Sequence, residues 1–147
     1  MESKANQILQ QAVIVHQQGK LEEAERLYRA ILQSQPKHPD ANHNLGVLAV
    51  YLNKTEAALP FFKTAVDANP KIEQFWISYI DALIKDNQIN NAKRVIKKAK
   101  KKGFSSAKLD ALAAKSYPKT QAENVDKSNP SQQQLNTLLK YFQTGQY

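Results

Sequence analysis

The chain has 147 residues, contains no cysteine and carries a formal net charge of +8. This length favours one domain and is small for an enzyme with a separate catalytic domain, and the lack of cysteine excludes disulfides and thiol chemistry. Residues 1–6 lack the pattern of a secretory signal, and no apolar run approaches the roughly 18 residues that span a bilayer. We therefore expect a cytoplasmic protein without membrane contact.

Each third of the chain up to residue 104 is predicted to contain two antiparallel helices, whose apolar residues follow a 3.6-residue period. The helices are expected over residues 6–18 and 21–33, then 41–52 and 55–68, then 73–85 and 89–102. Pro36, Pro70 and Gly103 end the three pairs. Between the helices of a pair, glycine stands in the first turn and asparagine in the other two, because asparagine also tolerates positive φ.

Three kinds of position recur together every 34 residues. The small, turn-forming and bulky apolar columns are Ala24, Ala58 and Ala92; Gly19, Asn53 and Asn87; and Tyr28, Phe62 and Ile96. Such recurrence indicates one supersecondary unit copied in tandem, in which each copy needs its neighbour to bury its apolar face. Arrays of this kind hold partners more often than they catalyse reactions.

These columns resemble the tetratricopeptide repeat over residues 5–104. Ala12 and Gly46 occupy the small position of the first helix, the alanine column occupies that of the second, and prolines close the first two repeats. The resemblance implies an all-α, right-handed solenoid of three repeats at 5–38, 39–72 and 73–106. Ile80 is large where the family has glycine or alanine, which predicts that the third repeat packs differently.

Beyond residue 104 the repeat register is lost. Residues 105–117 are predicted to form a helix that covers the open end of the array, and the polar residues 118–130 are typical of a linker. Residues 131–147 resemble the first helix of a further, truncated repeat, so we expect the natural chain to continue. This helix is amphipathic, and its apolar stripe, here named the C-terminal stripe, consists of Leu135, Leu138, Leu139, Tyr141 and Phe142.

The C-terminal stripe needs a surface to cover it. Burial of one large apolar side chain contributes on the order of 1.5 to 3 kcal/mol, so docking is favoured over exposure. The helix can fold back on its own array, dock on a second copy of the chain to form a homodimer, or stay undocked. The second alternative makes the stripe a self-association surface.

The family resemblance also implies a binding face. The first helices of the repeats build a concave surface in the family, and the matching positions here mix polar and apolar residues suited to an extended peptide or a helix. These positions are Asn6, Leu9, Gln10, Val13, Gln17, Asp40, His43, Asn44, Val47, Tyr51, Gln74, Ile77, Ser78, Asp81 and Lys85. We expect a non-enzymatic scaffold for a protein, a peptide or a second copy of the chain, without a cofactor.

Two binding modes of the family fit this chain poorly. Members that bind chaperone tails hold a terminal carboxylate with basic residues and asparagines, and only Asn44 matches. The other positions hold Leu9, Val13, Gln74 and Ser78. The asparagine ladder of the O-linked N-acetylglucosamine transferases is likewise represented only by Asn44.

An alternative function comes from bacterial proteins of similar layout. In these proteins a short array, a helix, a linker and a renewed repeat precede a glycosyltransferase or sulfotransferase domain. By analogy, this chain is alternatively the substrate-presenting arm of such an enzyme.

The positive charge is concentrated in one helix. Nine basic residues and one acid lie between Lys85 and Lys108, and the rest of the chain is neutral. Lysine dominates this run and residues 93–102 contain no aromatic side chain, so a solvated outer surface is favoured and nucleic-acid binding is not expected. The histidines show no metal-ligand spacing, and no motif indicates a catalytic or metal site.

Overall fold

The computed structural model describes residues 3–104 and 107–115, and the regular structure of this part of the chain is entirely helical. Its helices are α1 (Lys4–Gln17), α2 (Leu21–Ser34), α3 (Pro39–Tyr51), α4 (Thr55–Ala68), α5 (Glu73–Lys85), α6 (Ile89–Lys101) and α7 (Ala107–Lys115). The predicted all-α fold is confirmed. The helices expected over residues 6–102 are present, and their ends agree with the predicted ends to within two residues.

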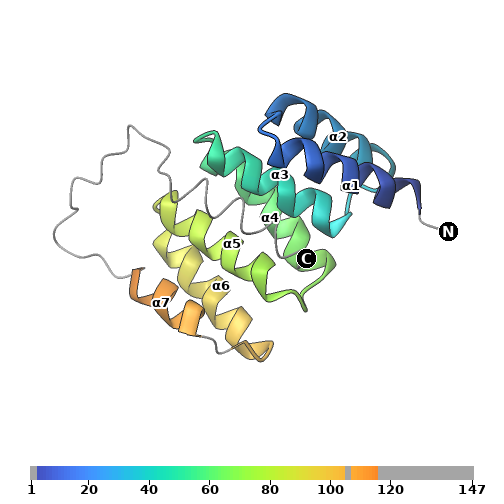
Figure 1. Cartoon of the computed structure of the whole chain (residues 1–147). Helices are drawn as coiled ribbons and strands as arrows, with labels where there is room; N and C mark the ends of the chain where they lie inside the picture. Colours follow the sequence, from blue (N-terminus) through green and yellow to red (C-terminus); the bar gives the residue numbers. More distant parts are fainter. Residues whose placement is uncertain (1–2, 105–106, 116–147) are drawn as a thin grey trace.

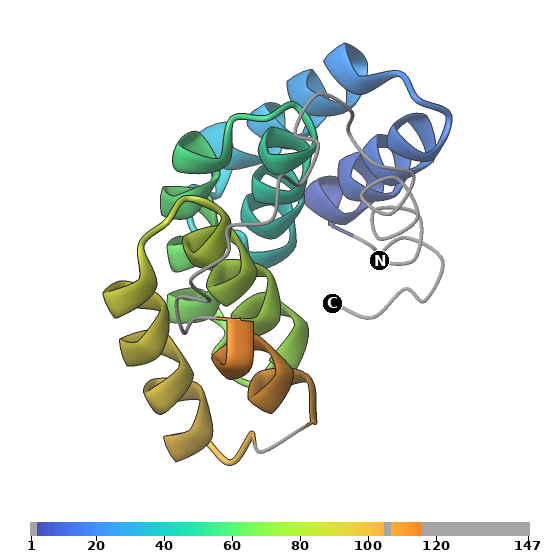
Figure 2. The ribbon, with the colours of Figure 1, turned by 90° about the vertical axis from the view of Figure 1, so that its left-hand side faces the viewer.

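The helices pack in chain order, as Figure 1 shows. The helices α1 and α2, α3 and α4, and α5 and α6 form antiparallel pairs, and α2 contacts α3 as α4 contacts α5. In Figure 2 the array forms an arc, with α1, α3 and α5 along its inner side. We call this side the inner face and the side of α2, α4 and α6 the outer face. No helix in the described ranges is long and apolar enough to cross a membrane.

The turn inside each repeat has one backbone form. Gly19 has a φ of 80°, and Asn53 and Asn87 each have a φ of 61°, which confirms the predicted left-handed turn residues. The next residue donates its backbone N–H to the carbonyl five residues earlier: Lys20 to Val15 at 2.9 Å, Lys54 to Ala49 at 2.8 Å and Gln88 to Leu83 at 2.8 Å. These bonds satisfy carbonyls at the end of each first helix and turn the chain into the second.

The core inside each repeat pairs a position of the first helix with the bulky column of the second. Ala12 and Tyr28 share one buried cluster, and Ile80 and Ile96 share another. In the middle repeat, Gly46 lies so close to the Phe62 ring that an added Cβ would be 2.5 Å from a ring carbon. The size of one partner therefore sets the size that the other can have.

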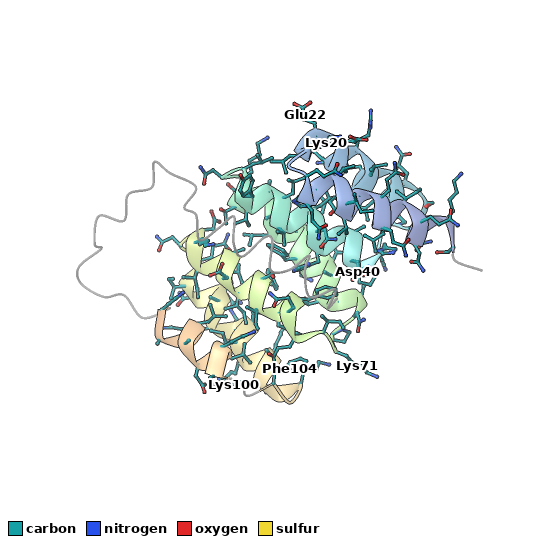
Figure 3. All side chains as sticks on the ribbon, viewed as in Figure 1. Lys20, Glu22, Asp40, Lys71, Lys100 and Phe104 are labelled. Carbon is teal, nitrogen blue, oxygen red and sulfur yellow. The ribbon has the colours of Figure 1, made fainter. Side chains whose placement is uncertain are left out.

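The last described helix, α7, contacts both α5 and α6. Its Leu109 and Leu112 are buried in the cluster that also contains Ile80 and Ile96. An ion pair of 3.1 Å joins Asp110 of α7 to Lys100 of α6, and Figure 3 labels Lys100. The helix lies within the range 105–117 predicted for a covering helix, whereas the predicted linker 118–130 and helix 131–147 lie outside the described residues.

Candidate functional site

The inner face is where the positions predicted to bind a partner are found, because α1, α3 and α5 carry all of them. Their exposure divides them into a rim and a floor. The exposed rim residues are Asn6, Gln10, Gln17 and Lys85, the half-buried residues are Leu9, Val13, Asp40, Tyr51, Gln74, Ile77 and Asp81, and the buried floor residues are His43, Asn44, Val47 and Ser78. Exposed amide side chains of α1 and the exposed Lys85 of α5 therefore border a floor that is partly apolar.

The polar part of the floor links the second repeat to the third. A hydrogen bond of 2.8 Å joins Nε2 of His43 on α3 to Oγ of Ser78 on α5, and Nδ1 of His43 lies 3.3 Å from Oδ1 of Asn44. Nε2 of Gln74 donates to Oγ of Ser78 at 3.2 Å. The imidazole also lies against the ring of Phe75, with 4.8 Å between centroids. The arrangement fixes the relative position of two neighbouring helices of the inner face.

The same burial keeps His43 uncharged. Removal from water lowers its pKa to about 4, against a smaller raising effect from the hydrogen bond with Asn44. Nδ2 of Asn44 is buried and has no hydrogen-bond partner among the described residues. The asparagine that matches the carboxylate-binding members of the family is therefore part of the packed floor and is not presented to solvent.

The apolar part of the floor spans α1 and α3. Val47 forms a cluster with the half-buried Val13 and Tyr51, which places apolar groups of two repeats side by side. Ile14, which the sequence analysis left out, is 53% exposed and follows Gln10 by one helical turn. The signal that could have identified it is its position outside the buried stripe of its own helix.

The charged groups of the inner face nearly cancel. Asp81 and Lys85 form an ion pair of 2.9 Å. Asp40 stands in the first turn of α3 (Figure 3), where burial raises the pKa of its carboxyl and the nearby His38 lowers it less. The face thus differs from the outer face, where the lysines of α6 are exposed while its Ala92, Val95, Ile96 and Ala99 are buried.

Sequence reasoning missed a second buried histidine. Nδ1 of His16 on α1 lies 2.9 Å from the hydroxyl of Tyr28 on α2, and burial lowers the pKa of His16 to about 4. This pair lies inside the first repeat and does not belong to the inner face. Among the described residues, no three His, Asp or Glu side chains are grouped so that they could hold a metal ion.

A concavity lies on the outer face, among the described residues. Its lining residues all belong to α2, and two of them, Glu25 and Arg29, form an ion pair of 2.8 Å. A hollow with one helix as its lining encloses a ligand poorly. The residues predicted for self-association, the C-terminal stripe, lie outside the described residues.

Comparisons with known proteins agree with this architecture. The tetratricopeptide repeat family model matches residues 9–71. The crystal structure of the Sgt2 TPR domain from Aspergillus fumigatus superposes with a TM-score of 0.68 at 16% identity, covering 90% of this chain and 95% of that chain. No curated protein matches the chain.

The stacked helix pairs with a repeated left-handed turn define a helical-repeat protein. The family model matches tetratricopeptide repeats within residues 9–71, and the described helices share the fold of a TPR domain. Arrays of this class are in general protein-interaction scaffolds and not catalysts.

Proposed function

We propose that the inner face binds an extended peptide or an amphipathic helix of a partner protein. The observation that carries the proposal is the floor that Val13, Val47 and Tyr51 form across two repeats, beside an exposed rim of amide side chains. Apolar side chains of a ligand would pack on the floor. The rim amides can donate to and accept from its main chain.

The charge of the inner face indicates which ligands it suits. Because Asp81 and Lys85 neutralise each other, the described residues of the face offer no cluster of basic groups for an acidic tail. The carboxylate-binding residues of the family are replaced by Leu9, Val13, Gln74 and Ser78, which favour apolar and neutral polar contacts. The proposed ligand is therefore nearly uncharged, and its affinity should depend weakly on salt.

The proposal keeps the chain in the non-enzymatic class, as a scaffold for a protein or peptide. A second copy of the chain, which would form a homodimer through the C-terminal stripe, stays a prediction. The substrate-presenting arm of a glycosyltransferase or sulfotransferase also stays a prediction, and no contact in the described residues favours it over a scaffold.

Selection of ligands from a random peptide-display library on the full chain tests the proposal. We expect enriched peptides to be amphipathic and nearly uncharged, and to bind at least tenfold more weakly to an Ile14→Lys, Tyr51→Ala variant. Lys97→Ala on the outer face is the matched control, because Lys97 is exposed and far from the floor. Enrichment of acidic peptides whose binding is lost with Lys97→Ala would contradict the proposal.

A further inference from the structure

We infer that the exposed side of α6 is a second binding surface, which takes the sugar-phosphate backbone of a nucleic-acid duplex regardless of its base sequence. We call this surface the basic strip. It consists of the exposed basic residues of α6 and its C-cap, Lys93, Arg94, Lys97, Lys98, Lys100, Lys101 and Lys102. The strip lies on the outer face, away from the inner-face floor, so the inference does not depend on the proposed function.

The packing of α6 holds these cations on one side of the helix. Ala92, Val95, Ile96 and Ala99 are buried in one core cluster, together with Ile80 of α5. Because about 3.6 residues make one helical turn, burial of that stripe leaves all seven basic residues exposed to solvent. The strip is therefore already formed in the folded chain, and a ligand does not have to order it.

Most charges of the strip are not neutralised within the array. The sequence alone favours a solvated surface, since it does not show which acids pair with the lysines in the folded chain. One ion pair of the strip joins Lys100 to Asp110 at 3.1 Å. The lysines of the strip that form no ion pair with another described residue are Lys97, Lys98, Lys101 and Lys102. Their positive charges are therefore available to an anion from outside the chain.

The positive surface is one helix wide. Helix α6 has six basic residues and no acid, whereas α2 and α4, the other helices of the outer face, each have one more acid than base. A flat bilayer laid against the outer face would also meet exposed acids such as Glu22 on α2 (Figure 3) and Glu56 on α4. A rod of negative charge can lie along α6 alone. The shape of the strip thus favours a rod-like polyanion over a membrane.

The density of charge along the strip is close to that of a duplex. Residues 93–102 rise about 14 Å along the helix axis, so their seven basic residues place roughly one positive charge in every 2 Å. Double-stranded DNA carries one negative charge per about 1.7 Å of its axis. A second copy of this chain does not supply such a density, because the most acidic of the described helices, α2, has three acids and two bases.

The side chains of the strip suit phosphates better than bases. Residues 93–102 contain no aromatic side chain on which the bases of a single strand could stack. Lysine presents a compact charge on a flexible stem, and it lacks the planar group with which arginine pairs with two atoms at once. Contacts of this kind position a protein on the backbone and carry no sequence information. The ligand is therefore a duplex of any sequence.

Fluorescence anisotropy of short labelled duplexes on the full chain tests the inference. DNA and RNA duplexes, each in two unrelated sequences, are titrated between about 20 and 200 mM salt. Contact with about five to seven phosphates predicts that the logarithm of the association constant falls against the logarithm of salt concentration with a slope of about −4 to −6. The two sequences of a duplex should bind within about threefold of each other.

Binding of either the DNA or the RNA duplex supports the inference, and the tighter of the two identifies the source of the phosphates. Absence of binding to both duplexes at the lowest salt would overturn the inference. A difference between the two sequences of one duplex larger than about threefold would overturn it as well, because phosphate contacts do not distinguish sequences.

Three lysines of the strip can be neutralised without disturbing the fold, because they are exposed and glutamine favours helices. The variant with Lys97→Gln, Lys98→Gln and Lys101→Gln should bind the duplex at least about tenfold more weakly at low salt, with a slope smaller by about 2 to 3. Helical circular dichroism confirms that the variant is folded. An unchanged affinity in the folded variant would overturn the inference.

The matched control removes the same charge from exposed positions in turns and loops, with Lys20→Gln, Lys37→Gln and Lys54→Gln. Lys20 and Lys54 make no side-chain cap hydrogen bond, so their helices keep their ends. This control should change the affinity for the duplex by less than about threefold, because charges far from the strip are screened. Equal losses in the two triple variants would assign the binding to net charge alone and overturn the inference.

Competition identifies any other occupant of the strip. Polyglutamate and anionic lipid vesicles should each displace the labelled duplex less well than unlabelled duplex does at equal concentration of charge. Stronger displacement by polyglutamate would replace the duplex with an acidic protein, and stronger displacement by vesicles would replace it with a membrane; either result overturns the inference. Tyr51→Ala on the inner face should leave duplex binding unchanged, so the inference and the proposed function can fail separately.

Discussion

The second and third repeats share a backbone but fill it with side chains of opposite sizes. In the second, Gly46 on α3 faces the large ring of Phe62 on α4, and in the third, Ile80 on α5 shares its cluster with the smaller Ile96 on α6. A larger residue on the first helix of a repeat is accompanied by a smaller residue on its second helix. Packing thus constrains the sum of the two volumes more tightly than either residue alone.

The two repeats also form an equivalent hydrogen bond, but with a different donor side chain in each. Nδ2 of Asn42 donates to the carbonyl of Pro36 at 3.1 Å, and Nε1 of Trp76, at the same repeat position, donates to the carbonyl of Pro70 at 2.8 Å. Each bond fastens the start of a first helix to the loop that precedes it. The position therefore requires a donor of the right reach, and the rest of the side chain can vary.

The largest expected effect comes from removing the large partner of the third repeat. Ile80→Ala leaves a cavity beside Ile96 in a fully buried cluster, and we expect it to lower the free energy of unfolding by about 2–5 kcal/mol. Urea denaturation followed by helical circular dichroism measures the change. Ile80→Val is the matched control, at about 0.5–1.5 kcal/mol. A loss below 1 kcal/mol for Ile80→Ala would show that the third repeat does not depend on this pair.

Acid should destabilise the second repeat by protonating His43. The third repeat has Ile77 at the same position, which does not titrate. The pKa of His43 is about 4 in the folded chain and 6.5 in the ordinary state, so between these values the unfolded chain binds more protons. The free energy of unfolding should therefore fall by on the order of 3 kcal/mol from pH 6.5 to pH 4 and lose nothing more from this group below pH 4.

The measurement is the urea midpoint as a function of pH for the native chain and for His43→Gln. His16 should contribute a similar loss, because burial lowers its pKa to about 4 as well. His43→Gln is therefore expected to remove about half of the pH dependence. An unchanged profile in His43→Gln would mean that this imidazole is accessible to protons in the folded chain.

Gly46→Ala tests whether the second repeat, like the third, limits the summed volume of its two packed residues. The new Cβ would lie 2.5–2.8 Å from three carbons of the Phe62 ring, so the ring or α3 must move, at a cost of about 1–3 kcal/mol. Phe62→Leu in the same chain should recover part of this loss by making room for the methyl group. A double-mutant cycle in urea measures the coupling. Additive effects of the two substitutions would contradict direct steric contact.

The sequence could predict the helices and turns because both depend on local chemistry. The apolar period places each helix, and a residue that tolerates positive φ is needed wherever the turn bond forms, as at Gly19 and Asn53. The buried contact between His43 and Ser78 could not be predicted, because it joins residues 35 positions apart whose approach depends on how two repeats stack. The family register places Asn44 on the binding face, but only packing shows that it is buried.

The smallest expected effect concerns the turn between the two helices of a repeat, whose backbone form the two repeats share. Asn53 and Asn87 have the same φ of 61°, and alanine in that conformation is strained by about 1–2 kcal/mol. Asn53→Ala and Asn87→Ala should each lower the free energy of unfolding by about 1 kcal/mol, while the corresponding glycine variants should change it by only a few tenths. Urea midpoints of the four variants check this. Equal losses at both turns would show that the backbone of the turn is a property of the repeat unit, whereas the core substitutions act through the particular side chains of one repeat. A loss at only one turn would instead tie the left-handed residue to its local packing.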